Sequence, residues 1–217
     1  EVERRYWRAD GSEFWGHLSG RRMLAVDGQT VGLVAVMADI TDSKRAEERQ
    51  QHHNRVLKCL ADKVSMQAVL ETMVLDVQAM QPTSLCSILL LDAQGQHLHH
   101  VAAPSLPVFF IQALDGAAIG MGVGSCGTAA FTGKVAIVED IATHPWWIPF
   151  RDLAQQAGLA ACWSQPILSA QGRVLGTFAI YHRTPGGPSA ADIELIEDEA
   201  RLAALVIEKS HADSRLQ

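Results

Sequence analysis

Apolar and polar side chains alternate over much of the first 43 residues, a pattern typical of strands with one face on a core. The longest alternating run extends from Glu13 to Met23 and follows the turn sequence at residues 9–12. A second turn at Asp27-Gly28 leads into an apolar strand from Val31 to Met37. With Arg4–Arg8 as a further strand, this segment is predicted to form an antiparallel sheet.

The pattern becomes helical from Ser43 to Met80, where neither proline nor glycine interrupts the chain. Residues 44–54 are almost entirely polar, and apolar positions then recur every three or four residues. The first of these positions are Leu57, Leu60 and Val64. We predict one long helix that ends before Gln81-Pro82, because the residue preceding a proline disfavours helical geometry.

Short apolar runs separated by turn residues come next, and each is typical of a strand. A run from Ser84 to Leu91 passes through a turn at residues 92–95 into a second strand, Leu98–Ala102. Residues 104–115 are expected to be irregular or weakly helical. Further strands are predicted at Ala136–Glu139, Ala161–Leu168 and Arg173–Tyr181.

A second long helix is predicted from Ala190 to about His211. Ser189 and Asp192 have the spacing of a capping box at its start. One apolar stripe has coiled-coil spacing and consists of Ile193, Ile196, Ala200, Ala203 and Ile207. Other apolar residues lie off this seam, so one stripe is expected to pack on the sheet and the other on a partner. We therefore predict a parallel homodimer that also uses Leu57, Leu60 and Val64.

A glycine-rich turn at residues 122–124 enters a predicted helix whose first turn contains Ser125, a candidate N-cap, and Cys126. The segments Val138–Ile141 and Ala161–Ile167 follow in order. This order resembles the GAF family of small-molecule sensing domains, over residues 57–210. The resemblance implies an α+β fold: a central antiparallel sheet of about six strands, helices packed on it, and long flanking signalling helices.

The N-terminal strands end in Asp39-Ile-Thr-Asp42, directly before Arg45-Ala-Glu-Glu48. Together with the turn at Asp10-Gly-Ser12, these motifs resemble the C-terminal part of a PAS domain. The resemblance implies a truncated PAS domain over residues 1–42. A signalling helix at 43–56, a GAF domain at 57–210 and the start of a linker to a missing output domain at 211–217 complete the expected organisation.

Composition narrows the class of protein. Hydrophobic residues make up 48% of the 217 residues and charged residues 19%, as in an ordinary globular protein. The net charge of −6 argues against a nucleic-acid surface, and no apolar run is long enough to span a membrane. The chain starts without methionine, so we expect a cytoplasmic fragment of a larger protein. The four cysteines lack metal-ligand spacing and are expected to be reduced thiols.

No catalytic motif is found, so the fragment is not expected to be an enzyme or to hold a metal. The segment around Cys126 is similar to free-methionine-sulfoxide reductases, but Cys162 lies too close to Pro166 to match their catalytic cysteine. Histidines 97, 99 and 100 are candidate haem ligands, although strand alternation puts His97 and His99 on one face and His100 on the other. No Cys-His pair for bilin attachment and no cyclic-nucleotide motif occurs. The cofactor is left open, with haem as one candidate.

The loop at 140–150 is predicted either to cap the core or to close a ligand cavity. The candidate ligand-binding residues are Asp140, Trp147, Phe150, Trp163, Gln165, Thr177 and Tyr181. Resemblance to the input regions of GGDEF/EAL enzymes implies a bacterial sensory fragment that controls cyclic-di-GMP synthesis or hydrolysis. The alternatives are a ligand-free dimerisation and signal-relay module, as in sensor histidine kinases, and an enzyme like the sulfoxide reductases.

Overall fold

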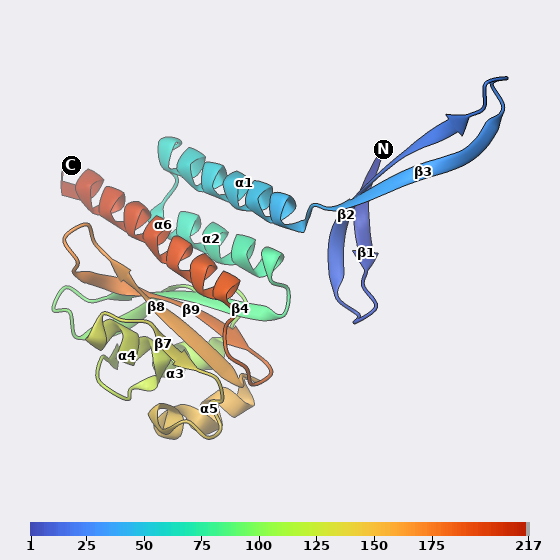
Figure 1. The fold of residues 1–217 in the computed structure, drawn as a ribbon. Coiled ribbons are helices and arrows are strands. Elements are labelled where there is room, and N and C mark those ends of the chain that lie inside the picture. Colours follow the sequence, from blue (N-terminus) through green and yellow to red (C-terminus); the bar gives the residue numbers. More distant parts are fainter. Residues whose placement is uncertain (216–217) are drawn as a thin grey trace. The chain divides into compact units, whose positions relative to one another are not determined.

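The computed structural model describes residues 1–215 and divides the chain into two compact units, residues 1–54 and the residues from 55 onward (Figure 1). The last two residues of the predicted linker at 211–217 lie outside the described part. In the first unit, β1 (Val2–Trp7), β2 (Glu13–Leu24) and β3 (Thr30–Asp39) form the predicted antiparallel sheet in the order β1-β2-β3. Its assignment to a PAS domain stays a prediction.

The single helix predicted over residues 43–80 is wrong. The structure has two helices, α1 (Thr41–Ala61) and α2 (Met66–Met80). Lys63 adopts a left-handed backbone with φ of 56°, and the Val64 N–H donates to the Cys59 carbonyl at 3.1 Å, which closes α1 in a Schellman-type turn. The Ser65 side chain then accepts from the Ala68 N–H and caps α2.

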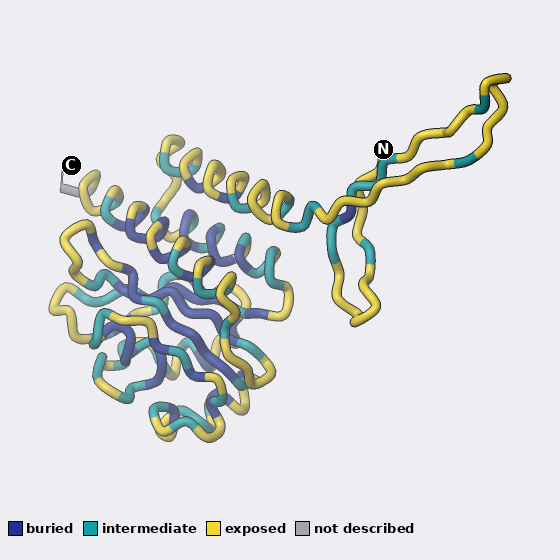
Figure 2. The backbone as a smooth tube through the Cα atoms, viewed as in Figure 1, coloured by how far each residue is buried: buried dark blue, intermediate teal, exposed yellow. Residues whose placement is uncertain are grey.

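The second unit contains one six-stranded antiparallel sheet in the order β6-β5-β4-β9-β8-β7. Its strands are β4 (Ser84–Leu91), β5 (His97–Ala102), β6 (Ala117–Ala118), β7 (Ala136–Val138), β8 (Ala161–Leu168) and β9 (Val174–His182). The predicted α+β architecture with about six strands is confirmed. The central strands β4, β9 and β8 are mostly buried (Figure 2).

Helices cover both faces of this sheet. Helices α2 and α6 (Ala190–Arg215) lie on one face. On the other face lie α3 (Val108–Leu114), α4 (Gly124–Thr132), the 3-10 helix η1 (Pro145–Phe150) and α5 (Arg151–Gln156). The expected polar loop at 140–150 is therefore largely helical.

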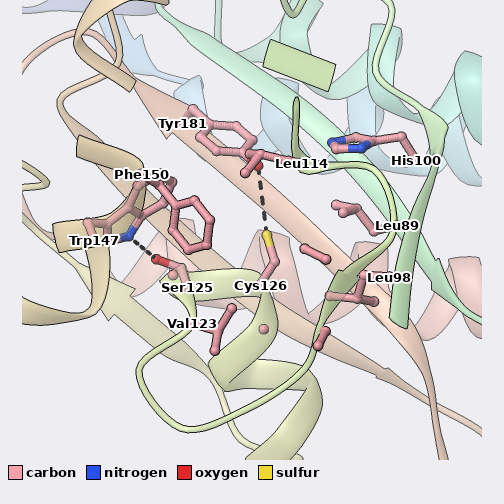
Figure 3. A pocket seen from close by; sticks show the side chains of 14 residues that line it. Leu89, Leu98, His100, Leu114, Val123, Ser125, Cys126, Trp147, Phe150 and Tyr181 are labelled. Atoms are coloured by element: carbon pink, nitrogen blue, oxygen red, sulfur yellow. Dashed lines mark hydrogen bonds between the residues drawn. The ribbon is translucent and has the colours of Figure 1, made fainter. Parts of the chain in front are cut away.

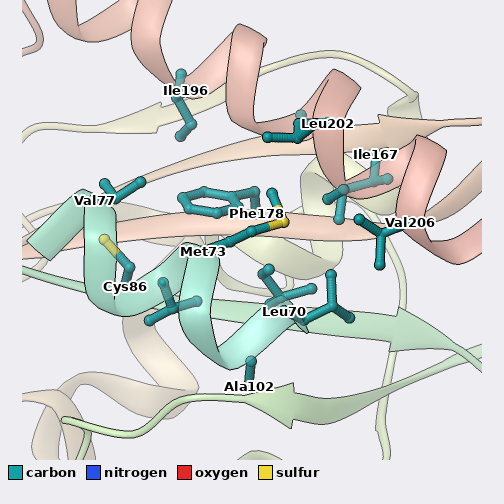
Figure 4. Packing of buried hydrophobic residues seen from close by; sticks show 14 of the residues in the cluster. Leu70, Met73, Val77, Cys86, Ala102, Ile167, Phe178, Ile196, Leu202 and Val206 are labelled. Carbon is teal, nitrogen blue, oxygen red and sulfur yellow. The ribbon is translucent and has the colours of Figure 1, made fainter. Parts of the chain in front are cut away.

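An apolar core fills the space between the sheet and the α2–α6 pair (Figure 4). Leu70 and Met73 of α2 and Ile196 of α6 pack around Phe178 of β9, and each side chain is at most 1% exposed. Burial of large apolar side chains contributes about 1.5–3 kcal/mol each, so this face supplies most of the packing stability of the unit.

Helix α6 begins with the predicted capping box. The Ser189 hydroxyl accepts from the Asp192 N–H at 3.2 Å, and the Asp192 carboxylate accepts from the Ser189 N–H at 2.8 Å. The predicted dimer seam is mostly occupied within the unit itself. Four of its members, Ile196, Ala200, Ala203 and Ile207, belong to the apolar core and are at most 3% exposed.

Candidate ligand-binding site

Asp140 shapes the chain between β7 and η1. Its carboxylate accepts from the Ala142 N–H at 2.9 Å and from the Thr143 hydroxyl at 2.8 Å. His144 precedes η1, and its ring nitrogen Nδ1 accepts from the Trp146 N–H at 3.3 Å. Asp140 is partly buried and holds the turn. The segment that follows it carries two aromatic rings, Trp147 and Phe150, over the sheet.

The start of α4 faces these rings. Ser125 was expected to cap this helix, but it is the second residue of α4, and the N-cap Val123 makes no side-chain capping bond. The Ser125 hydroxyl instead donates to the Cys162 carbonyl at 3.1 Å and accepts from the Trp147 indole N–H at 3.1 Å. One hydroxyl thus connects α4 to both β8 and η1, and Figure 3 shows its bond to Trp147 of η1.

A cavity lies between α4, η1 and the strands β4, β5 and β9. Its empty space is about 440 Å³, including open solvent at its mouth. The lining is mostly apolar, and its larger side chains are Leu89, Leu98, Leu114, Val123, Trp147 and Phe150. Four residues with polar side-chain groups also line it: His100, Ser125, Cys126 and Tyr181. Few polar groups among apolar walls are typical of small-molecule sites.

The His100 ring is the least satisfied of these groups. Its side chain is 4% exposed, and neither ring nitrogen has a hydrogen-bond partner. Asp115 binds the His100 backbone N–H at 2.8 Å, but its carboxylate is 3.9 Å from the ring nitrogen Nδ1. Burial lowers the pKa of His100, against the smaller opposing effect of Asp115. The ring is therefore neutral near pH 7 and presents one donor and one acceptor.

The other two histidines of β5 have a different environment. His97 pairs with Asp92 at 2.8 Å and His99 with Asp115 at 3.3 Å, and both side chains are nearly half exposed. The alternation predicted for this strand thus separates His100 from the other two. Within the described residues, no group of three or more His, Cys, Asp or Glu side chains is placed to hold a metal ion.

Two thiols meet beside the Tyr181 hydroxyl. The Cys126 sulfur lies 3.7 Å from the Tyr181 oxygen, and Cys162 is the residue of β8 directly opposite Tyr181. A hydrogen bond from the Cys162 thiol, aided by the hydroxyls of Ser164, Tyr181 and Thr177, lowers the pKa of Cys126 to about 7, against the effect of burial. Burial raises the pKa of Cys162 well above its ordinary value.

The structure brings together three of the seven predicted site residues, Trp147, Phe150 and Tyr181, at the cavity. Thr177 lies on the same face of β9, beside Cys126, but outside the lining. Trp163 belongs to the core on the opposite face, where its ring lies 4.2 Å from that of His182 and its N–H donates to the Gly186 carbonyl. Gln165 shares that face by alternation along β8.

Sequence reasoning missed His100 and Cys126 as members of the site. The signal for His100 was its spacing from Leu98, because positions two apart in a strand share a face and Leu98 is an apolar, core-facing residue. Cys126 was expected to be a reduced thiol without a catalytic role, although its position in the first turn of a helix was recognised.

Comparison with known proteins agrees with this architecture. A model of the GAF domain matches residues 63–208. The methyl sulfide methyltransferase-associated sensor of Methanosarcina acetivorans is 38% identical over 190 residues, an alignment that covers 88% of this chain and 19% of that protein. The chain therefore spans about a fifth of the length of this curated relative.

Solved structures show the same fold at low identity. The GAF domain of a phosphoenolpyruvate-protein phosphotransferase from Coxiella burnetii superposes with a TM-score of 0.63 at 16% identity, covering 78% of this chain and 98% of that one. A domain of a two-component sensor histidine kinase protein from Sinorhizobium meliloti gives 0.59 at 23%, covering 70% and 98%. Free methionine-R-sulfoxide reductase from Neisseria meningitidis gives 0.60 at 19%, covering 78% and 93%.

Proposed function

Since the chain belongs to the GAF domain family, we propose that it is the sensory input region of a larger signalling protein and that the cavity beneath η1 receives a small-molecule signal. The similarity to a protein described as a sensor supports the signalling class. The cavity supports the ligand, because the buried His100 ring lacks any hydrogen-bond partner in a mostly apolar space.

The unpaired imidazole indicates the chemistry of the ligand. A buried polar group without a partner costs about 1–3 kcal/mol, and a ligand that hydrogen-bonds it recovers part of this free energy. The neutral ring matches an uncharged ligand better than a carboxylate or an ammonium group. We therefore expect a small, largely apolar molecule, flat enough to lie against Trp147 and Phe150, with one hydrogen-bonding group near His100.

Indole is a suitable probe of this cavity because it is flat, uncharged and carries one N–H donor. We expect millimolar indole to raise the melting temperature of the wild-type protein and to raise that of His100→Leu much less. His99→Leu is the matched control, since His99 lies next to His100 on β5 but is exposed. An equal shift in His100→Leu and wild type, or no shift in either, contradicts the proposed site.

Absorbance and native mass spectrometry of the purified protein complete the test. A molecule retained in the cavity gives an added mass, and a Soret band identifies that molecule as haem. A clean apo mass together with no response to probes favours the alternative of a ligand-free relay module.

Catalysis is assigned to another part of the full-length protein. A sensor kinase output is one candidate, because the same fold occurs in a domain of a two-component sensor histidine kinase protein, and an output that makes or degrades cyclic-di-GMP is the other candidate.

We also propose that the protein is cytoplasmic and forms a homodimer. The helical contact of the dimer would use Leu57, Val64 and Leu205, which are 40–47% exposed, rather than the buried seam of α6. Within the described residues, no helix is both long and apolar enough to cross a membrane.

A further inference from the structure

The proposed sensing role makes no use of the Cys126 and Cys162 thiols. Cys126 lines the cavity and is partly exposed, whereas Cys162 is fully buried behind it. Cys126 thus has access to small molecules that enter the cavity, and Cys162 has access only to Cys126 and its neighbours. Solutes in the cavity can therefore contact the Cys126 sulfur but not the Cys162 sulfur.

Three contacts show that the two cysteines are neighbours in space although 36 positions apart. Cys162 and Tyr181 are paired across β8 and β9, so their side chains point to the same face. The Cys126 sulfur lies 3.7 Å from the Tyr181 oxygen. The hydroxyl of Ser125, the residue before Cys126, donates to the Cys162 carbonyl at 3.1 Å.

The surroundings of Cys126 favour its thiolate. It lies in the first turn of the nine-residue helix α4, where backbone N–H groups and the helix dipole stabilise negative charge. The Tyr181, Ser164 and Thr177 hydroxyls and the Cys162 thiol add donors around the sulfur. The Ser164 and Thr177 hydroxyls have no other hydrogen-bond partner, so they are free to serve this purpose.

A third cysteine, Cys86, provides a contrast. Cys86 is 0% exposed in the apolar core between the sheet and the α2–α6 pair, and burial raises its pKa to about 12. Its thiol is therefore protonated and out of reach of solutes.

We propose that Cys126 is a hydroperoxide-reactive thiol and that Cys162 is its resolving partner, so that the cavity also reports oxidants. The Cys126 thiolate attacks the terminal oxygen of a hydroperoxide such as hydrogen peroxide. The O–O bond breaks, the leaving oxygen takes a proton to become water, and Cys126 becomes a sulfenic acid.

The Cys162 sulfur then attacks the sulfenic sulfur and gives up its proton. The S–O bond breaks, a second water leaves and an S–S bond forms. Each sulfur is oxidised by one electron, and the peroxide is reduced by two. The bond requires a separation of about 2.05 Å between the sulfurs, so the start of α4 must move toward β8. Because the Ser125 hydroxyl also accepts from the Trp147 indole N–H, this movement would displace η1, which covers the cavity.

Peptide mapping of the wild-type protein tests the proposal directly. After treatment with hydrogen peroxide, we expect the intact mass to fall by two hydrogen atoms. After free thiols are then blocked, the oxidised protein should carry two fewer blocking groups than the reduced protein, and a Cys126–Cys162 peptide pair should appear. Dithiothreitol should reverse these changes. A disulfide that maps to Cys59 or Cys86, or sulfenic acid that accumulates without any disulfide, overturns the proposal.

Variants separate the two roles. In Cys162→Ala, oxidation should stop at the sulfenic acid of Cys126, which dimedone labels. In Cys126→Ser, both the label and the disulfide should be lost, whereas Cys86→Ser should behave like wild type. Dimedone labelling of Cys126 at least tenfold above that of Cys86 is expected from the difference in thiolate content. Equal dimedone labelling of Cys126 and Cys86 contradicts the proposal. The labelling is measured both in Cys162→Ala and in wild type after brief oxidation, so the test remains valid if the variant fails to fold.

Discussion

On β9, Phe178 and Ile180 point to the face of the sheet covered by α2 and α6, whereas Thr177 and Tyr181 point to the face covered by α4 and η1. The first face meets mostly apolar side chains, which form the largest core cluster of the described residues. The second face meets hydroxyls, two thiols, an unpaired imidazole and a cavity. Both environments come from one strand whose side chains alternate in direction.

The difference shows how the unit divides its tasks. Loss of an apolar side chain from the filled face removes packing that nothing replaces. Polar groups with incomplete hydrogen bonding on the other face reduce stability, but they supply the donors and acceptors that a ligand or an oxidant needs. Substitutions on the α2–α6 face should therefore reduce mainly stability, whereas substitutions on the α4–η1 face should change mainly ligand binding or thiol reactivity.

Neighbouring substitutions on β9 should give the largest contrast. Phe178→Ala is expected to lower the free energy of unfolding by about 3–5 kcal/mol, because it leaves a cavity in the filled core. Thr177→Val should change it by less than about 1 kcal/mol, since the Thr177 hydroxyl has no hydrogen-bond partner apart from the Cys126 sulfur. Urea denaturation measures both. Similar losses in the two variants would remove the distinction between the faces.

Ser125→Ala should have the next largest effect. It leaves the Trp147 indole N–H and the Cys162 carbonyl without their hydrogen bonds, at a cost of about 1–3 kcal/mol. The loss should be accompanied by a shift in tryptophan emission as η1 loosens. An unchanged melting temperature and unchanged emission would show that Ser125 does not hold the roof of the cavity.

Acid should weaken the protein partly through His100. The folded pKa of this ring is below its ordinary value of 6.5, so the unfolded chain binds a proton more readily. The stability that depends on the neutral ring is present above about pH 6.5 and is lost as the pH falls. Between pH 7 and pH 5, His100→Leu should lose less stability than wild type, by about 1 kcal/mol. Parallel pH profiles from urea denaturation would contradict this.

Tyr181→Phe should have the smallest effect on stability and a clear effect on reactivity. The lost hydroxyl contacts Cys126 at 3.7 Å and accepts from Ser87 at 3.4 Å, both long contacts, so the free energy of unfolding should fall by no more than about 1 kcal/mol. Loss of a donor raises the pKa of Cys126, and alkylation by iodoacetamide at pH 7 should slow by up to about tenfold. Faster alkylation would reverse the assigned role of Tyr181.

The strands were well predicted from the sequence because alternation and turn residues are local signals. Both Ser84–Leu91 and Ala161–Leu168 have the predicted bounds in the structure. The break between α1 and α2 was missed, because no glycine or proline marks it and a lysine takes the left-handed position. Ser65, which caps α2, is a weak signal in the middle of a helical composition.

The site was harder to predict than the fold. The aromatic pair Trp147 and Phe150 lies at the cavity, whereas Trp163 and Gln165 lie on the opposite face of β8, and the binding role of all four stays a prediction. A one-residue difference in alternation decides the face of a side chain, and composition does not reveal it. The pairing of Cys126 with Cys162 depends on how α4 crosses the sheet, which is a tertiary property.

The turn between α1 and α2 has a mechanical consequence. In one continuous helix, each inserted or deleted residue rotates all later residues by about 100° around the helix axis. A rotation at one end is therefore transmitted to the other end. The left-handed residue Lys63 and the new cap at Ser65 interrupt such a helix. Residues 55–61 and α2 are instead joined laterally, for example by the Arg55–Asp76 ion pair at 3.0 Å. A motion of α2 therefore displaces residues 55–61 sideways rather than rotating them. We expect that the turn at 62–65 can change in length without rotating one helix relative to the other.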